Sequence, residues 1–261
     1  MLTVLSGLWQ LSPLTDLSLP QGDLAFPAPI SSILPADLSE SDIAAQEWHL
    51  MHDVDVSEAM LACAAIDIVL KGVSHYAEVR INGNAVIDCF DCEETYRKEV
   101  KSHLQVGLNR IEILFLEQQD DDFLLDDDAP NMTDTTNKNN QVGIFGSIEL
   151  QGIAHLRLER VTVIPILHHG CGEVKVVIYF QTLATGMIAA NTKFDGMSYS
   201  IPIDVRSNRV TALFQVDAPR FWKTECPDNN DLYHIEVELE GQVMHIPYRM
   251  FEDQSEASFC Y

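Results

Sequence analysis

The segment Lys71-Gly72-Val73-Ser74-His75-Tyr76-Ala77-Glu78-Val79-Arg80-Ile81-Asn82-Gly83 decides the fold, together with Val106-Gly107-Leu108-Asn109-Arg110-Ile111-Glu112-Ile113. Apolar and polar residues alternate in both stretches, which is the pattern of β-strands that bury one face. Asn82-Gly83-Asn84 and Gly107-Leu108-Asn109 stand beside these strands, and their residue types supply the positive φ angles of a hairpin. The two stretches therefore predict a β-sandwich.

Strand patterns continue through most of the chain. Strands are predicted over residues 5–11, 49–56, 65–71, 77–82, 110–117, 147–152, 157–165, 173–182, 197–204, 209–216, 232–239 and 242–249. Residues 34–47 depart from this pattern and predict short helical turns, with Asp37 or Ser39 as the N-cap. Residues 118–141 are polar and predict a long loop.

Several motifs also carry a resemblance to a known family. The strand that ends in Asn82-Gly83, followed by a Leu-x-x-Gly-x-Asn turn that ends at Asn109, resembles the jelly-roll sugar-binding domain at the N-terminus of glycoside hydrolase family 2 proteins, β-mannosidases especially. Residues 143–150 stand where relatives have G-I-W-R-P-V-x-L. Residues 158–165 resemble the opening of the immunoglobulin-like sandwich that follows in the family, and residues 218–239 resemble its closing strand pair. The motifs occur in the family's order over nearly the whole chain.

The resemblance implies an all-β protein of two domains. Residues 1–152 would form a galactose-binding-like jelly-roll sandwich, and residues 153–261 an immunoglobulin-like β-sandwich with a short acidic C-terminal tail. In relatives, the two catalytic carboxylates come from a (β/α)₈ barrel, which takes ~250 residues. A chain of 261 residues is too short to add one, so we expect no catalytic residue and no cofactor. Residues 135–143 also lack the aromatic G-W-D-W-G run of the β-mannosidase branch.

The composition argues against nucleic acid and membranes as partners and against a secreted protein. The net charge is −24, from 40 acidic and 16 basic residues, and such a polyanion is repelled by nucleic acid and by anionic membrane surfaces. No stretch approaches the ~18 to 20 apolar residues of a membrane span, and the N-terminus lacks the pattern of a signal peptide. The six cysteines lack the dense spacing of a secreted scaffold, so we expect a cytoplasmic protein.

An acidic run within residues 118–141 has two interpretations. Asp120, Asp122, Asp126 and Asp128 are the candidate calcium ligands, because Ca²⁺ binds carboxylate oxygens. The alternative is a solvated loop whose charges repel one another, and the clustered spacing favours it. Asn131 and Asp134 of the same segment are the candidate carbohydrate contacts.

Other residues are candidates for a metal, redox or binding site. Cys89 and Cys92 have the spacing of a zinc or redox pair but no further ligands nearby in sequence, so free thiols are expected. The run His168-His169-Gly170-Cys171 is expected to be a turn rather than a metal site. No G-x-S-x-G nucleophile motif occurs. The tryptophans are expected to lie in the core rather than on a sugar-binding surface; they are Trp9, Trp48 and Trp222.

The sequence thus leaves three functional hypotheses. The first is a non-catalytic carbohydrate-binding or accessory module. The second is a protein-interaction subunit that pairs with a separately encoded hydrolase or another partner. The third, a hydrolase with its site in the sandwiches, is the least favoured. An exposed aromatic ring beside polar groups would favour the first hypothesis, and a large flat apolar patch would favour the second.

Overall fold

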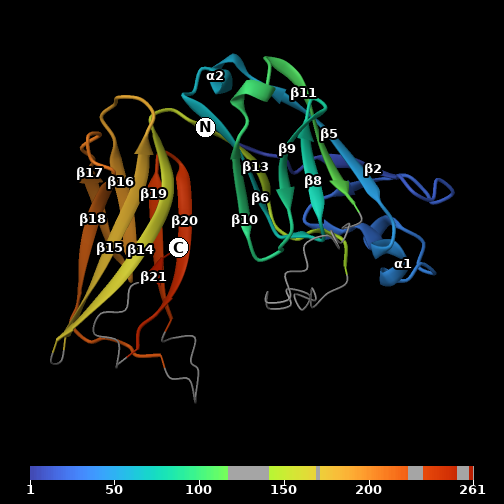
Figure 1. Cartoon of the computed structure of the whole chain (residues 1–261). Coiled ribbons are helices and arrows are strands. Elements are labelled where there is room, and N and C mark those ends of the chain that lie inside the picture. Colours follow the sequence, from blue (N-terminus) through green and yellow to red (C-terminus); the bar gives the residue numbers. More distant parts are fainter. Residues whose placement is uncertain (117–140, 169–170, 223–231, 252–258, 261) are drawn as a thin grey trace, which may run out of the picture. The chain divides into compact units, whose positions relative to one another are not determined.

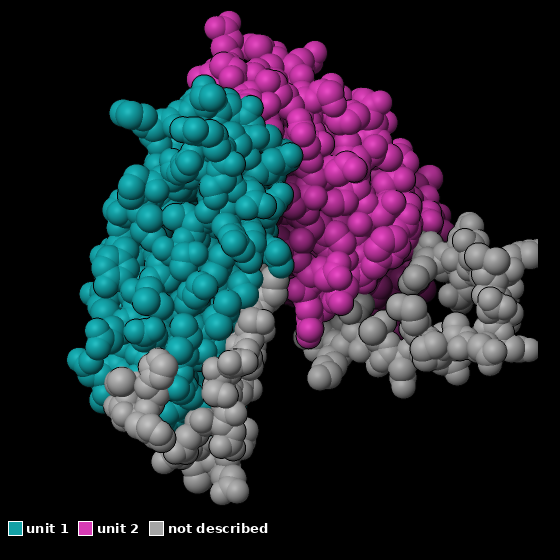
Figure 2. Space-filling model, turned by 60° about the vertical axis from the view of Figure 1, so that its left-hand side comes forward, with its two compact units in different colours: residues 1, 153–261 teal, residues 2–152 magenta. Residues whose placement is uncertain are grey.

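The computed structural model describes residues 1–116, 141–168, 171–222, 232–251 and 259–260, and it is built almost entirely of antiparallel strands (Figure 1). It divides into two compact units, residues 2–152 and residues 153–261, the latter grouped with Met1 (Figure 2). The predicted all-β fold is confirmed. Among the described residues, no helix is long and apolar enough to cross a membrane.

The first unit is a jelly-roll sandwich of two main sheets. The larger, six-stranded sheet has the order β3 (Gly22–Ala25), β2 (Leu8–Pro13), β5 (Trp48–Val56), β11 (Gly107–Phe115), β8 (Ala77–Ile81) and β9 (Asn84–Cys89). The smaller sheet has the order β1 (Leu2–Val4), β13 (Ile148–Ile153), β6 (Ala65–Lys71) and β10 (Thr95–Glu99). A short sheet joins β4 (Ala28–Pro29), β12 (Gly143–Ile144) and β7 (Val73–Ser74).

Short helices connect these strands. They are η1 (Ile30–Ile33), α1 (Glu40–Ala44), α2 (Glu58–Leu61) and η2 (Lys101–His103). Ser39 caps α1 in a capping box: its hydroxyl accepts from the Asp42 backbone N–H, and the Asp42 carboxylate accepts from the Ser39 backbone N–H. The helical turn predicted within residues 34–47, with Ser39 as one of its two candidate caps, is confirmed.

Alternation along the strands builds the core of the first unit. Residues of β8 and β11 at every second position, Val79 and Ile113 among them, are fully buried, because a strand sends successive side chains to opposite faces. Trp9 and Trp48 lie in this core with no exposed surface. Their indole N–H groups donate to the carbonyl oxygens of Leu5 and Ile43, at 3.3 Å and 2.9 Å.

Two asparagines tie the turns beside β8 and β11 together. The Asn82 amide donates to the His103 carbonyl oxygen at 2.8 Å and to Asn109 Oδ1 at 3.0 Å, and Asn82 Oδ1 accepts from the Arg110 backbone N–H. Asn109 is 1% exposed and also donates to two backbone carbonyl oxygens of its own turn. A buried amide such as that of Asn109, with all these partners satisfied, fixes the register of the strand that carries it.

The sequence misplaced one hairpin. Asn82 and Gly83 have positive φ, as expected, and join β8 to β9. In the second predicted turn only Gly107 has a positive φ, of 89°, and all three of its residues are the first residues of β11 rather than a hairpin loop. The structure places β8 and β11 side by side as antiparallel neighbours, from Ile81 opposite Ile111 to Ala77 opposite Phe115.

The second unit is an immunoglobulin-like sandwich of two four-stranded sheets. One has the order β18 (Arg209–Val216), β15 (Cys171–Thr182), β14 (Leu156–His168) and β21 (Phe259–Cys260). The other has the order β17 (Met197–Pro202), β16 (Ala189–Phe194), β19 (Leu232–Leu239) and β20 (Gln242–Arg249). Aromatic rings fill the space between them: Phe194 lies 5.1 Å from Tyr233 and 5.3 Å from Phe214, measured between ring centroids.

The end of the chain differs from the predicted acidic tail. Residues 252–258 lie outside the described residues, but Phe259 and Cys260 form β21 and pair with Val163 and Thr162 of β14. The sequence missed this strand because two residues carry no alternation. The chain therefore returns to the sandwich after β20 instead of leaving it.

Candidate functional site

The candidate ligands from the acidic segment cannot be placed. The calcium candidates Asp120, Asp122, Asp126 and Asp128 and the carbohydrate candidates Asn131 and Asp134 all lie outside the described residues. Among the described residues, no group of three histidine, cysteine, aspartate or glutamate side chains is placed to hold a metal ion. Cys63, Cys89 and Cys92 are free thiols, and burial followed by the charge of Asp88 raises the pKa of the Cys89 thiol to about 12.

The tryptophans do not form a binding surface. Trp9 and Trp48 are core residues, as expected. Trp222 is only half-buried, so the core prediction was wrong for this residue. The Arg249 guanidinium lies 4.6 Å from the centre of its ring and covers one face, which is a common way to shield an aromatic ring at a surface.

An aromatic pair with one exposed ring, Phe90, and one half-buried ring, Tyr76, occurs instead on the outer face of the six-stranded sheet. Tyr76 directly precedes β8 and Phe90 directly follows β9; their rings stack with centroids 5.2 Å apart and an interplanar angle of 22°. Ala77 pairs with Cys89 in the ladder, and both side chains are buried. Successive side chains of a strand point to opposite faces, so Tyr76, just before Ala77, and Phe90, just after Cys89, both point to the outer face. Phe90 is 59% exposed. We call Tyr76 and Phe90, with the adjacent pair Glu78 and Asp88, the aromatic platform.

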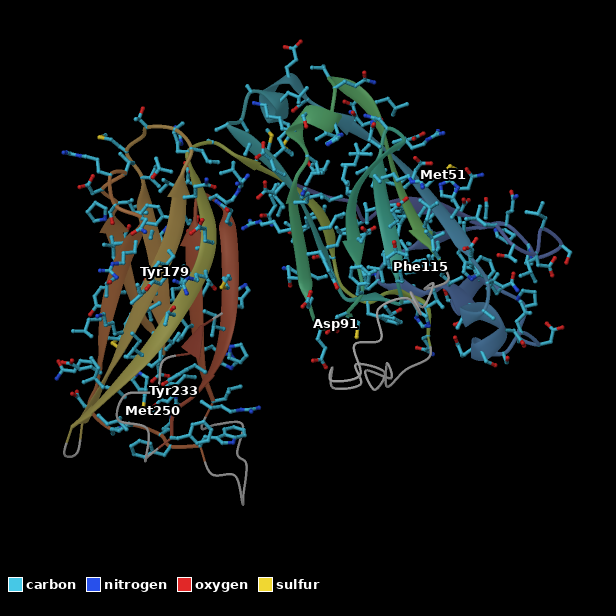
Figure 3. The ribbon with its side chains drawn as sticks, in the orientation of Figure 1. Met51, Asp91, Phe115, Tyr179, Tyr233 and Met250 are labelled. Carbon is cyan, nitrogen blue, oxygen red and sulfur yellow. The ribbon has the colours of Figure 1, made fainter. Side chains whose placement is uncertain are left out.

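The turn that carries Phe90 is held from the other sheet. Tyr96, in β10, accepts hydrogen bonds at its phenol oxygen from the backbone N–H groups of Phe90 and Asp91, both at 2.7 Å. The Asp91 carboxylate accepts from the backbone N–H of Glu93 at 2.8 Å. Figure 3 labels Asp91 in this turn and Phe115 at the end of β11. These hydrogen bonds hold the backbone of the turn, and the ring of Phe90 stacks on Tyr76, in the absence of any ligand.

The charges of the platform are mostly negative. Glu78 and Asp88 are directly opposite each other in the β8–β9 ladder. The Tyr76 hydroxyl donates to Asp88 at 3.4 Å, which is a weak contact. Burial, followed by the charges of Asp88 and Glu78, raises the pKa of Tyr76, so its phenol stays protonated. Arg80 forms an ion pair with Glu78.

This arrangement can bind a small polar ring. The exposed Phe90 ring offers an apolar surface to the C–H face of a pyranose, and the carboxylates accept hydrogen bonds from hydroxyl groups. Recognition sites commonly combine apolar rings with a few polar groups at their edge. The sequence did not predict the pairing of Tyr76 with Phe90, because it did not predict the strand β9 that brings the two rings together. In the alternating segment, Tyr76 stands at a position that faces outward, and this was the signal that could have revealed its role.

The second unit has a different polar surface. A depression of about 740 Å³ lies at one end of the β16–β19–β20 face. Its charged groups are largely paired: Lys193 Nζ lies 2.7 Å from Glu236, and Arg220 Nη2 lies 2.8 Å from Asp195. The Arg220 guanidinium also lies 4.4 Å from the centre of the buried Tyr233 ring. We call this surface the sheet depression; it offers paired charges and no exposed aromatic ring among its lining residues.

Most of the first unit matches the model of a known family. Residues 34–144 match the model of the family described as glycosyl hydrolase 2 galactose-binding domain-like. The resemblance to glycoside hydrolase family 2 is confirmed. The matched residues include β5, β6, β8, β9 and β11, and with them the whole aromatic platform. No curated protein matches the chain in a sequence comparison.

Solved structures of this family superpose on both units. The β-D-mannosidase from Dictyoglomus thermophilum matches 96% of this chain with a TM-score of 0.68 and 14% identity, and 36% of its own chain is covered. The FMN-binding β-glucuronidase from Facaelibacterium prausnitzii matches 96% with a TM-score of 0.67, 11% identity and 39% of its own chain covered. A β-galacturonidase from Eisenbergiella tayi bound to galacturonate matches 96% with a TM-score of 0.63, 17% identity and 43% covered. At these identities the likeness concerns the fold, and the chain spans well under half of each of these proteins.

Proposed function

We propose that this chain is a non-catalytic carbohydrate-binding module that serves as an accessory to a glycoside hydrolase. The observation that carries the proposal is the exposed Phe90 ring, stacked on the half-buried Tyr76 and edged by Glu78 and Asp88. The galactose-binding-like family match over the same residues supports a sugar as the ligand.

Binding would use two kinds of contact. The Phe90 ring would cover the apolar face of a pyranose, which removes aromatic and C–H surface from water. The Asp88 carboxylate would accept hydrogen bonds from hydroxyl groups at the ring edge, and charged acceptors give stronger bonds than neutral ones. The turn is held by Tyr96 before any ligand arrives, so little ordering entropy opposes binding.

The proposal excludes hydrolysis by these residues. A retaining glycosidase keeps one of two nearby carboxyl groups protonated in an enclosed site. Asp88 lies exposed on the open face of a sheet, where water reaches it freely. We expect the purified 261-residue chain to leave aryl β-mannosides and β-galactosides intact. Turnover that a single carboxylate substitution abolishes would contradict this.

Affinity electrophoresis against a panel of neutral and charged polysaccharides tests the binding function. We expect retardation on at least one glycan, and its loss in Phe90→Ala and Tyr76→Ala. Tyr199→Ala is the matched control, because Tyr199 is 44% exposed but lies in the second unit. A panel without any binding, or equal losses in all three variants, would refute the proposal.

A second candidate function is supported by the small share of each structural relative that this chain covers. The superposed region makes up only 36 to 43% of the family 2 proteins described above, so those proteins contain a large part that has no counterpart in these 261 residues. We propose as the alternative that the chain is a protein-interaction subunit that pairs with a separately encoded hydrolase or another partner. Co-purification of a defined complex that hydrolyses a glycoside, from cells that express the tagged chain, tests it. A cytoplasmic location also stays a prediction.

A further inference from the structure

In the described part of the chain, the two carboxylates of the aromatic platform share a single cationic partner. Glu78 and Asp88 are directly opposite in the β8–β9 ladder, an arrangement in which like charges destabilise a sheet. Arg80 is the cation paired with Glu78. Among the described residues, no ion pair reaches Asp88, whose one polar side-chain contact is the long hydrogen bond from Tyr76.

Among the described residues, the sequence neighbours of the platform supply no further positive charge. His75 precedes Tyr76, and burial lowers the pKa of its imidazole, so it is neutral near pH 7. On the other side, Phe90 is followed by Asp91, and Glu93 and Glu94 continue the same turn. On β11, Leu114 is opposite Glu78, and it carries no charge. Within the described residues, the exposed Phe90 ring thus has mainly carboxylates as its charged neighbours.

An electron-rich aromatic face edged by carboxylates attracts a cation and repels an anion. The face of a phenyl or phenol ring attracts an ammonium group through its quadrupole, and a carboxylate beside the ring adds a direct charge contact. A uronate would place its own carboxylate against Asp88 and Glu78 and would be disfavoured. The platform is thus expected to prefer a cation to an anion, although two of the structural relatives described above are named for uronic acids.

We infer that the aromatic platform selects amino sugars: a protonated 2-amino-2-deoxyhexose would stack on Phe90 and place its ammonium group between Asp88 and Glu78. The inference rests on the proposed carbohydrate-binding function and names the chemical class of its ligand. It predicts a preference order of amino sugar first, neutral sugar second and uronate last.

Isothermal titration with three oligosaccharides in slightly acidic buffer tests this order. The probes are a β-1,4-linked glucosamine trimer, cellotriose, which replaces each ammonium group by a hydroxyl, and a trimer of glucuronate. We expect the glucosamine trimer to bind about fivefold tighter than cellotriose, and the glucuronate trimer not to bind measurably. The preference should shrink as salt is added, because exposed charges are screened.

Two charge-matched variants separate the platform from the general negative charge of the protein. Asp88→Asn should lower affinity for the glucosamine trimer about threefold and leave affinity for cellotriose nearly unchanged. Asp55→Asn removes the same charge from an exposed position of β5 in the same sheet and should change neither. Equal losses in both variants would mean attraction by net charge alone and would overturn the inference.

The outcomes also distinguish this inference from the function on which it rests. If cellotriose binds as tightly as the glucosamine trimer and Phe90→Ala abolishes both, the ligand class is wrong but carbohydrate binding stands. If neither trimer binds and the glycan panel is also negative, the proposed function fails, and the inference fails with it.

Discussion

The aromatic platform of the first unit and the sheet depression of the second unit both combine rings with charged side chains, but they use them differently. In the depression the Tyr233 ring is buried beneath Arg220, and the nearby carboxylates each have a basic partner. In the platform the Phe90 ring is exposed and Asp88 has no cation beside it among the described residues. Satisfied charges over a buried ring stabilise a fold, whereas an exposed ring with unsatisfied charges is available for a ligand.

The largest expected effect concerns the two rings. Tyr233→Ala removes a ring that is 1% exposed and should destabilise the second unit by about 3 to 5 kcal/mol. Phe90→Ala should cost less than about 1 kcal/mol, because its ring is mostly in water already. Hydrogen exchange read by mass spectrometry measures the two units separately. A Phe90→Ala loss as large as that of Tyr233→Ala would show that the platform ring is structural.

A second test compares two turns of the same type. Asn82-Gly83 and Asp195-Gly196 both have positive φ at both residues. Asn82→Ala breaks three hydrogen bonds, one of them to the buried Asn109, and should cost about 2 kcal/mol. Asp195→Ala breaks an ion pair with Arg220, in which the Asp195 side chain is 45% exposed and the Arg220 side chain 41% exposed. Placing alanine at positive φ costs free energy of unfolding in both turns, and loss of the ion pair should add about 0.5 kcal/mol to it. Urea unfolding curves of both variants measure this, and equal costs would contradict it.

Removing one negative charge should raise the stability of the protein at the platform and lower it at the sheet depression. Asp88→Asn relieves a like-charge pair and should raise stability by a few tenths of a kcal/mol, about 0.3. Glu236→Gln removes the partner of Lys193 and should lower it. The hydrogen bond from Lys193 lowers the pKa of Glu236, so its contribution is present above the ordinary glutamate pKa and is lost as the pH falls through the lowered value. Melting temperatures of both variants, compared at neutral and acidic pH, test the signs. Two changes of the same sign would remove the distinction between the sites.

The smallest expected effect concerns calcium. If Asp120 to Asp128 form a solvated segment, millimolar Ca²⁺ should change the melting temperature no more than Mg²⁺ at equal ionic strength, because both act only by screening the charge of −24. A specific site would stabilise the protein by ~2.7 kcal/mol at a hundredfold excess over Kd. A rise with Ca²⁺ alone, abolished by Asp126→Asn with Asp128→Asn, would contradict this prediction.

Strong periodicity made most of the fold predictable. The strands Ala65–Lys71, Arg209–Val216, Leu232–Leu239 and Gln242–Arg249 occur with the predicted bounds, because their apolar residues alternate or run without interruption. The sequence missed β16, which contains few large apolar residues. It also missed β9, whose pairing with β8 is interrupted by a register shift between Val79 and Arg80. The two-residue strands β4, β7 and β12 are too short to show a period.

The candidate site was harder to predict for a physical reason. Tyr76 and Phe90 are far apart in the chain, and they meet only because the β8–β9 ladder has one particular register. A shift of one residue would turn one ring to the other face of the sheet. The charge of the site was visible in the sequence, since Asp88, Asp91 and Glu93 are close together, but their relation to Tyr76 was not.

The hydroxyl of Tyr96 has a consequence for how this surface can diversify. It holds the turn through the backbone N–H groups of Phe90 and Asp91 and makes no demand on their side chains. A mutation at position 90 can therefore alter which molecule is recognised while the loop keeps its conformation, whereas the Asp91 side chain itself holds the turn through the Glu93 backbone N–H. Position 90 is thus a natural place for related proteins to acquire new specificities, and a convenient one for selecting binders from a library randomised at that position.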